Sequence, residues 1–346
     1  MSTAELLYDE LQHVEFGSGG PFSEKQCQDM APIVDEINAL KKEKNAVILA
    51  HYYVDPQIIT GVGDFVGDSY KLAKDAKGTN ADIIVFAAVK FMAETAKVLN
   101  PDKTVYVPSK YNGCSLADAV TDADVRRLKV EFPEHTFVCY INTTAAVKAE
   151  CDVCVTSSNV YDIIERLPTD KIYFLPDRLM GLNVRDELAR RGVEKDIQLY
   201  DGTCYVHEAF DADRVEKLRA KYPEVRVLAH PECAPDIIAK ADHVASTKGM
   251  MQYLQDTDYE AYLLLTECGL ASRAEIAMPD KKFIGPCVEC RYMKSNTLED
   301  ILRVLKQPDD DDRVEIDASV RDGALACIEN MFKYAEMKPS DAPTSD

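Results

Sequence analysis

Three cysteines, Cys114, Cys204 and Cys290, are the residues in this sequence whose type and spacing most strongly suggest chemistry. They lie 90 and 86 residues apart, each in an irregular segment that follows an apolar run. Thiolates prefer zinc, copper(I) or iron–sulfur clusters. A cubane cluster held by three cysteines leaves one iron open to substrate as a Lewis acid, which suits dehydration chemistry. Zinc and plain packing remain the alternatives, because zinc more often takes closely spaced or mixed ligands.

The other cysteines are predicted to be free thiols, because the chain begins with no leader that indicates an oxidising compartment. The pair Cys151 and Cys154 could be a redox dithiol or half a zinc site, but it leads into an apolar strand and packing is favoured. The repeat selects Cys290 over Cys287, which becomes a reserve thiol. Four further cysteines are assigned to the core: Cys27, Cys139, Cys268 and Cys327.

Polar side chains follow the same strands. His51 and His230 occupy the same strand end in two of the repeats, with Tyr140 at that place in the repeat between them. Three residues lie beyond these ends, Tyr53, Asn142 and Glu232. A carboxylate in such a place can abstract a proton, so Glu232 is the best candidate for a base. Its alternative role is to cap the helix that follows Pro235.

Hydroxyl side chains at predicted helix starts could bind phosphate or carboxylate, helped by free backbone N–H groups and the helix dipole. In each single case a plain N-cap is the simpler explanation, but their equivalent positions suggest an anionic substrate. The hydroxyl residues are Ser69, Ser157, Ser158, Ser246 and Thr247, and Asp68 precedes Ser69 at one of these helix starts. His207, three positions after Cys204, could form a local metal clip with it, pack in the core, or belong to a larger site.

A repeat of about 90 residues must position these groups. "AVILAHYYVDPQI", "TFVCYINTTAAVK" and "VRVLAHPECAPDI" each indicate a buried strand, a polar turn and a helix start, with the strands ending near Ala50, Tyr140 and His230. Second strands are expected in "ADIIVFAAV", "CDVCVTSS" and "ADHVAST", and third strands in "TVYVPS", "KIYFLP" and "AYLLLT". This alternation predicts α/β units with parallel sheets.

We therefore expect three homologous three-layer α/β/α domains with short parallel sheets around a pseudo-threefold axis. The expected boundaries are 25–120, 121–215 and 216–335, the last including a C-terminal helix, with tails at 1–24 and 336–346. The first 20 or so residues and the C-terminal tail are expected to be disordered. Ligands of parallel sheets bind at the carboxyl ends of strands, so the three cysteines should converge there.

Composition limits the classes of partner. The chain has 40 basic and 60 acidic residues among 346, for a net charge of −20. Such a charge repels nucleic acid and anionic lipid, so neither is expected as a partner. The longest apolar run, from Ile83 to Val89, is far shorter than the roughly 20 residues of a membrane span. A cytoplasmic protein is predicted.

The motifs taken together resemble the quinolinate synthase family, the iron–sulfur enzymes of de novo NAD biosynthesis. The similarity covers about residues 25 to 335, and it is carried by "AHYYVDPQI", "GDSYKLA", "FMAETAKVLNP", "NTTAAVKA", "VTSSN", "GTCYVHE", "HPEC", "TECG" and "CVECRYMK". It implies three homologous α/β domains around a [4Fe–4S] cluster. It also implies that iminoaspartate and dihydroxyacetone phosphate condense to quinolinate, phosphate and two waters.

When the functional residues of the family are carried over motif by motif, the resemblance implies that the cluster ligands are Cys114, Cys204 and Cys290. It places Tyr53, Glu232, His230 and His51 in catalysis, and it implies substrate contacts for His51, Ser69, Tyr140, Asn142, Ser157, His207, His230, Glu232, Ser246 and Thr247. His207 would then face the substrate instead of sharing a metal with Cys204. L-aspartate oxidase would supply the imine, and the enzyme would be a monomer or homodimer. The rivals are a cluster-dependent hydro-lyase acting on another polycarboxylate, and a zinc or thiol-redox scaffold without turnover.

Overall fold

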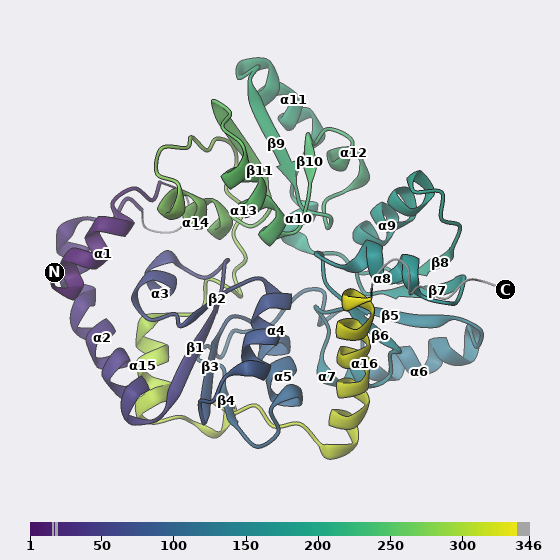
Figure 1. Ribbon diagram of the computed structural model, residues 1–346, viewed down its shortest axis with the longest axis horizontal. Helices are drawn as coiled ribbons and strands as arrows, with labels where there is room; N and C mark the ends of the chain where they lie inside the picture. Colours follow the sequence, from purple (N-terminus) through teal and green to yellow (C-terminus); the bar gives the residue numbers. More distant parts are fainter. Residues whose placement is uncertain (16, 18–19, 338–346) are drawn as a thin grey trace.

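Three short parallel β-sheets form the framework of the computed structural model, which describes residues 1–15, 17 and 20–337. Each sheet occupies one corner of a triangle in Figure 1. The strand orders are β2-β1-β3-β4, β6-β5-β7-β8 and β10-β9-β11. The α/β fold class with three short parallel sheets is confirmed. The predicted domain boundaries remain a prediction.

The first sheet is built around a strand buried on both faces. Its strands are β1 (Ala46–His51), β2 (Phe65–Gly67), β3 (Ile83–Ala87) and β4 (Thr104–Tyr106). Its helices are α1 (Thr3–Leu11), α2 (Glu24–Glu43), α3 (Pro56–Gly61), α4 (Ser69–Gly78) and α5 (Lys90–Leu99). Apolar residues fill β1 without alternation because helices cover both faces of a parallel sheet.

The second sheet repeats this plan. Its strands are β5 (Thr136–Tyr140), β6 (Val153–Val155), β7 (Lys171–Leu175) and β8 (Asp196–Leu199). Its helices are α6 (Asp122–Glu131), α7 (Ala145–Ala149), α8 (Val160–Arg166) and α9 (Arg178–Arg190). The start of α6 is fixed by a capping box, in which Thr121 and Asp124 satisfy each other's backbone N–H groups.

The third sheet is smaller. Its strands are β9 (Val225–Ala229), β10 (His243–Val244) and β11 (Ala261–Leu265). Its helices are α10 (Tyr205–Glu208), α11 (Ala212–Lys221), α12 (Pro235–Ile238), α13 (Thr247–Asp256) and α14 (Gly269–Ala277). A single parallel bridge between Tyr262 and Phe283 stands where the other sheets have their fourth strand.

The last helices return to the first two sheets. They are α15 (Leu298–Lys306), the 3₁₀ turn η1 (Asp310–Asp312) and α16 (Ala318–Glu336). Helix α15 packs against α2, and α16 packs against α7 and β6, as Figure 1 shows. The core follows the same division. One hydrophobic cluster joins the first two sheets and these helices, and two smaller clusters cover the faces of the third sheet.

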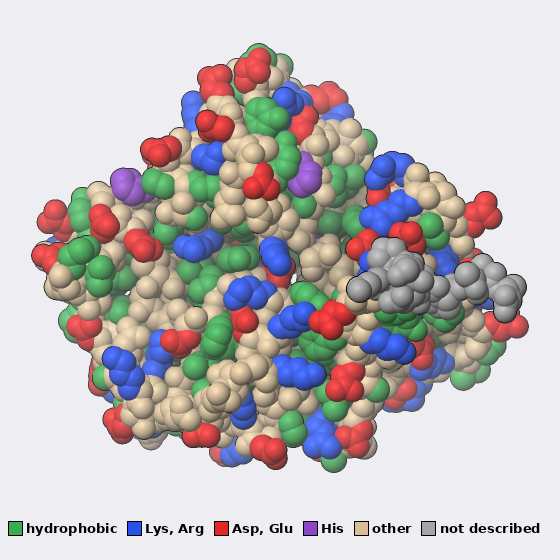
Figure 2. All heavy atoms as spheres, in the orientation of Figure 1, with side chains coloured by type: hydrophobic (Ala, Val, Ile, Leu, Met, Phe, Trp, Pro, Cys, Tyr) green, Lys and Arg blue, Asp and Glu red, His purple; other side chains and the backbone are tan. Residues whose placement is uncertain are grey.

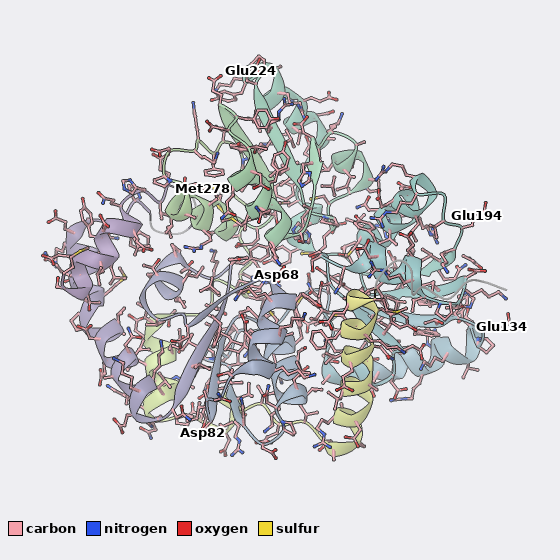
Figure 3. The ribbon with its side chains drawn as sticks, viewed as in Figure 1. Asp68, Asp82, Glu134, Glu194, Glu224 and Met278 are labelled. Atoms are coloured by element: carbon pink, nitrogen blue, oxygen red, sulfur yellow. A yellow bond between two sulfur atoms is a disulfide. The ribbon has the colours of Figure 1, made fainter. Side chains whose placement is uncertain are left out.

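The carboxyl ends of the strands converge on the centre of the molecule. In Figure 3, Asp82, Glu134 and Glu224, which precede β3, β5 and β9, lie at the periphery. Asp68, which directly follows β2, lies near the centre. The polar turns that follow the strands of all three sheets can therefore meet at one place, as the sequence predicted.

The strand order corrects the predicted alignment of the repeats. We matched the segment of β3 to those of β6 and β10, but β6 and β10 lie on the side of the central strand that β2 occupies in the first sheet. Strand β3 is instead equivalent to β7 and β11, and β4 to β8. The sequence missed β2 because three residues, of which Phe65 and Val66 are half-buried, show no periodic pattern.

The prediction that the first 20 residues are disordered is wrong for the segment that forms α1. Ser2 and Glu5 build a capping box, and Leu7 and Leu11 are buried against α2. A nine-residue helix is marginal by itself, so its stability comes from this packing, which a local pattern does not reveal. The predicted C-terminal tail from residue 338 onward lies outside the described residues.

Charged side chains of both signs are interspersed over the face that Figure 2 shows. None of the described helices combines the length and the apolar composition needed to cross a membrane.

Candidate active site

A cavity lies where the three sheets meet, and it is lined by nearly all of the predicted site residues. Side chains from each of the three repeats contribute to it. The predicted residues that line it are His51, Tyr53, Ser69, Cys114, Tyr140, Asn142, Ser157, Cys204, His207, His230, Glu232, Thr247 and Cys290. Ser246 is absent from the lining, because its hydroxyl caps α13 by accepting a hydrogen bond from the N–H of Gly249 at 3.2 Å.

Three thiols line this cavity, one from each repeat. Each belongs to the segment that follows the last strand of its sheet, and in the third sheet the bridge at Phe283 takes the place of that strand. Burial raises the pKa of Cys114 to about 12 and also raises the pKa values of Cys204 and Cys290. Within the described residues, the three sulfur atoms do not all lie within 4.8 Å of one another. Burial disfavours the thiolate form of these side chains, so a bound cationic metal centre would be needed to stabilise three thiolates at this cavity.

Two imidazoles occupy matching positions in the first and third repeats. Nδ1 of His51 accepts a hydrogen bond from the N–H of Tyr53 at 3.2 Å, and Nδ1 of His230 accepts one from the N–H of Glu232 at 3.3 Å. Burial lowers the pKa of each histidine to about 3, so both rings are neutral at physiological pH. With Nδ1 accepting, the proton of each ring lies on Nε2, which is then a donor.

A hydrogen-bonded chain of five side chains crosses the site. The Tyr53 hydroxyl lies 2.7 Å from Oγ1 of Thr266, which lies 3.0 Å from Nε2 of His207. Nδ1 of His207 lies 3.0 Å from Oε2 of Glu232, and the Tyr140 hydroxyl donates to Oε1 of Glu232 at 2.6 Å. Residues from all three repeats therefore form one network.

The negative charge of Glu232 determines which atoms donate and which atoms accept along this network. Burial alone would raise the pKa of Glu232, but His207 and the Tyr140 hydroxyl, which both donate hydrogen bonds to the carboxylate, lower it to about 2. The ionised carboxylate accepts from Nδ1–H of His207, which leaves Nε2 to accept from the Thr266 hydroxyl. Thr266 in turn accepts from Tyr53. Burial keeps the pKa values of both tyrosines well above the ordinary value, so both hydroxyls remain protonated donors.

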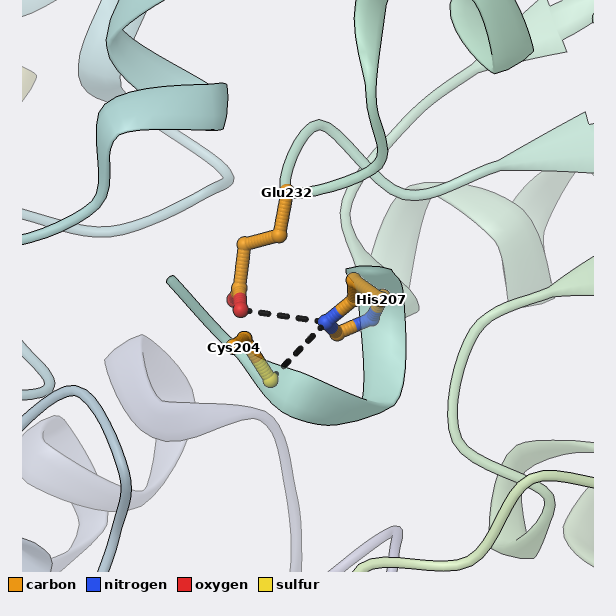
Figure 4. Close-up of side chains that lie close together, drawn as sticks. All are labelled: Cys204, His207 and Glu232. Carbon is orange, nitrogen blue, oxygen red and sulfur yellow. Dashed lines mark hydrogen bonds and ion pairs between the residues drawn. The ribbon is translucent and has the colours of Figure 1, made fainter. Parts of the chain in front are cut away.

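The alternative role considered for Glu232, a helix cap, is not what the structure shows. Helix α12 begins after Ala234 and has no side-chain cap. Figure 4 shows Glu232 directed instead at His207, which also contacts Cys204 with 3.3 Å between Nδ1 and Sγ. Cys204, His207 and Glu232 are the described residues whose donor atoms all lie within 4.8 Å of one another, the spacing of a mononuclear metal site.

Small hydroxyls line the cavity at the starts of α4 and α13 and in the turn that precedes α8. Ser69, Ser157 and Thr247 follow β2, β6 and β10, which the strand order makes equivalent. Asp68 caps α4 by accepting from the N–H of Lys71 at 2.8 Å, which leaves the Ser69 hydroxyl available to the cavity. The corrected alignment thus places one small hydroxyl from each repeat around the same space.

The sequence analysis did not single out two residues of this site, Thr266 and Glu267. Both directly follow β11 and are buried. Oε1 of Glu267 accepts from the N–H of Cys290 at 3.0 Å, and burial raises the pKa of Glu267 to about 7 although Lys294 opposes this. Their position at the end of a strand was the available signal.

The prediction that every cysteine is a free thiol is wrong for one pair. Cys268 and Cys287 form a disulfide, with their Cα atoms 5.1 Å apart. Cys268 begins α14, and Cys287 lies in the segment that leads to Cys290, so the bond holds this segment against the end of β11. Cys287 is therefore a bonded partner in the structure and not a reserve thiol. The sequence could not bring together two residues separated by 19 positions.

Comparisons with known proteins agree with this arrangement. The family model described as "Quinolinate synthetase A protein" matches residues 35–333. A quinolinate synthase of Caulobacter vibrioides is 44% identical over 306 residues, which cover 87% of this chain and 82% of that protein. One from Rippkaea orientalis is 41% identical over 309 residues, which cover 86% of this chain and 92% of that protein.

Proposed function

The chain belongs to the quinolinate synthetase A family, and from this premise we propose that it is a quinolinate synthase of NAD biosynthesis. The proposed reaction condenses iminoaspartate with dihydroxyacetone phosphate and releases phosphate and two waters as the pyridine ring closes. The proposal places the reaction in the cytoplasm, with L-aspartate oxidase as the source of the imine. Neither nucleic acid nor a membrane is a proposed partner.

One observation carries this proposal: Cys114, Cys204 and Cys290, which follow three different sheets, line the same cavity as Glu232. Three soft donors from three distant segments fit a [4Fe–4S] cluster better than zinc, which more often takes closely spaced or mixed ligands. We assign these cysteines as its ligands. When bound, a three-cysteine cluster supplies an iron without a protein ligand, which acts as a Lewis acid.

The substrate-binding role falls to neutral donors. The Nε2–H groups of His51 and His230 can donate to carboxylate oxygens without an ionic charge of their own. Asn142 and the hydroxyls of Ser69, Ser157 and Thr247 line the same space and can bind the remaining carboxylate and the phosphate. Fixed dipoles of this kind replace the water around an anionic substrate and orient its reacting groups.

The hydrogen-bonded chain provides a route for a proton. A substrate proton taken up by the Tyr53 oxygen can displace the tyrosine proton to Thr266, the threonine proton to Nε2 of His207, and the Nδ1 proton to Glu232. The three transfers within the protein would each join atoms no more than 3.0 Å apart. Glu232 is thus the final base, and Tyr53 is the residue that contacts the substrate.

An assay on anaerobically purified protein tests the proposal. We expect about four iron and four sulfide per chain, the content of one [4Fe–4S] cluster, and formation of quinolinate from the two named substrates. The spacing of Cys204, His207 and Glu232 favours a second candidate, a single metal ion at these three residues. Stoichiometric zinc without sulfide that is lost in the Cys204→Ser variant would establish that candidate instead. Iron and sulfide without quinolinate formation would indicate a hydro-lyase acting on another polycarboxylate.

A further inference from the structure

Four cysteines that the cavity does not use converge in the core of the second repeat. They are Cys139 in β5, Cys151 and Cys154 at the start of β6, and Cys327 in α16. All four are buried, with at most 7% of any residue exposed. The sequence analysis assigned each of them to packing, because no local pattern connects Cys327 with residues more than 170 positions earlier.

Cys139 is the hub of this group. It pairs with Cys154 in the parallel register of β5 and β6, so the two side chains leave the sheet on the same face. Its sulfur lies 3.6 Å from the sulfur of Cys327, and its thiol also interacts with the thiols of Cys151 and Cys154. The cysteines that line the central cavity have no such direct sulfur–sulfur contact among the described interactions.

Helix α16 is held in place over these thiols. A methyl group added at Gly323 would come within 2.8 Å of the carbonyl oxygen of Ala149, so the helix approaches α7 too closely for a larger residue. Nδ2 of Asn330 donates to the carbonyl oxygen of Asp152 at 2.9 Å, between Cys151 and Cys154. Gly323, Cys327 and Asn330 share one face of α16 by their spacing, so Cys327 is directed at the thiols.

A buried cation lies beside the group. Lys148 is 1% exposed, and its ammonium group donates to oxygens of Ile141 and Thr143, all of which are neutral. It interacts electrostatically with Cys139 and Cys154. A buried positive charge without a carboxylate among these acceptors favours negative charge nearby. Four thiolates around a divalent ion carry an excess negative charge that this lysine would offset in part.

We propose that Cys139, Cys151, Cys154 and Cys327 bind one Zn²⁺ ion as a structural site, which fastens α16 to the second sheet. Zinc–sulfur bonds of about 2.3 Å separate the sulfurs of a tetrahedral site by about 3.8 Å. The observed 3.6 Å between Cys139 and Cys327 matches this spacing. No three of the four sulfurs lie within 4.8 Å of one another in the described structure, so the proposed site requires the thiols of Cys151 and Cys154 to move toward Cys139 when zinc binds.

The chemistry of the donors supports zinc as the occupant. Four cysteines, two of them in a Cys-x-x-Cys pair, are a common ligand set of structural zinc. All four are buried, which leaves no open coordination position for a substrate, so the site is not catalytic. This inference is independent of the proposed function, because none of the four residues lines the cavity.

Zinc analysis of the full-length chain tests the site. The Cys204→Ser variant serves as the background, because it removes the candidate mononuclear site at Cys204, His207 and Glu232. After anaerobic loading with Zn²⁺ and removal of excess metal, we expect one zinc per chain. Its X-ray absorption spectrum should show four sulfur neighbours at about 2.3 Å. Added Cys154→Ser or Cys327→Ser should abolish stoichiometric zinc, whereas Cys27→Ser, a buried cysteine in α2, should retain it.

Hydrogen exchange provides a second readout, which requires no substitution among the four proposed ligands. Chelation of zinc from the Cys204→Ser protein should increase amide exchange in α16 and leave α15 unchanged. A protein that takes up no stoichiometric zinc, or a spectrum with nitrogen or oxygen neighbours, overturns the proposal. Retention of zinc after Cys154→Ser overturns it as well.

Discussion

At the residue scale, the chain from Tyr53 to Tyr140 explains why a buried site can contain a carboxylate with a pKa of about 2. Burial by itself would keep Glu232 protonated, but His207 and the Tyr140 hydroxyl both donate to it. Because His207 donates from Nδ1 to Glu232, its Nε2 can accept from its other partner, Thr266. Thr266 thus connects Tyr53 to the histidine and completes the proposed proton route to the base.

This role of Thr266 predicts a specific defect. Thr266→Val removes the hydroxyl at nearly constant volume, which breaks the route from Tyr53 to His207. Because a positioned acid or base contributes about 10²–10⁴-fold to a rate, we expect kcat for quinolinate formation to fall by at least about 10²-fold. Iron and sulfide contents should remain unchanged.

The matched control is Thr266→Ser, which keeps a hydroxyl at the same place and should retain most of the activity. The pH profile of kcat is the readout that a purely structural role would not change, and it should shift in the valine variant alone. Equal activity of the valine and serine variants would show that the chain does not carry the proton.

At the element scale, the short strands and helices form only because tertiary packing stabilises them. Strand β2 has three residues and β10 has two, yet both pair with the central strand of their sheet and place Ser69 and Thr247 at the cavity. Helix α1 likewise depends on α2 and α3, against which it packs. Local patterns are weak in such elements, so the sequence located the long central strands more reliably.

The packing of α1 predicts unequal effects of two leucines in the same helix. Leu11 is fully buried and Leu6 is 52% exposed. Leu11→Ala should lower the free energy of unfolding by about 2–5 kcal/mol, because it leaves a cavity between α1 and the first repeat. Leu6→Ala should change it by less than about 0.5 kcal/mol. Urea denaturation of the two variants measures the difference, and equal midpoints would mean that α1 is not part of the cooperative fold.

At the scale of the whole molecule, the position of three sheets with their strand ends inward creates the site. No single repeat contains it. The first contributes His51 and Cys114, the second Tyr140 and Cys204, and the third Glu232 among others. Because the network and the three thiols span the repeats, the site exists only when all three are packed together.

This arrangement predicts equal consequences for three distant substitutions. Cys114→Ala, Cys204→Ala and Cys290→Ala should each abolish the cluster, since each removes one of three ligands. The absorbance of the cluster and the iron and sulfide contents of each variant measure the loss of the cluster. Cys233→Ala is the control, because Cys233 is buried beside Glu232 but its thiol donates to the carbonyl oxygen of Leu265 at 3.2 Å. If the control loses the cluster and one of the three variants keeps it, the ligand assignment is wrong.

The sequence by itself determined the α/β class, the repeat of about 90 residues, and the positions of the three cysteines, the histidines and Glu232. It could do so because central strands of parallel sheets are continuous apolar runs, and the residues after them share one edge. The family resemblance, carried by the same turns, agrees with the family match.

Only the tertiary structure decided which residues from different repeats touch. The partners of Glu232, the role of Thr266, the Cys268–Cys287 bond and the four thiols around Cys139 all join side chains far apart in the chain. The true equivalence of β2 with β6 and β10 also required the strand order. Local patterns record burial along one element, whereas these contacts depend on how separate elements pack, and a single sequence does not encode that packing as a periodic signal.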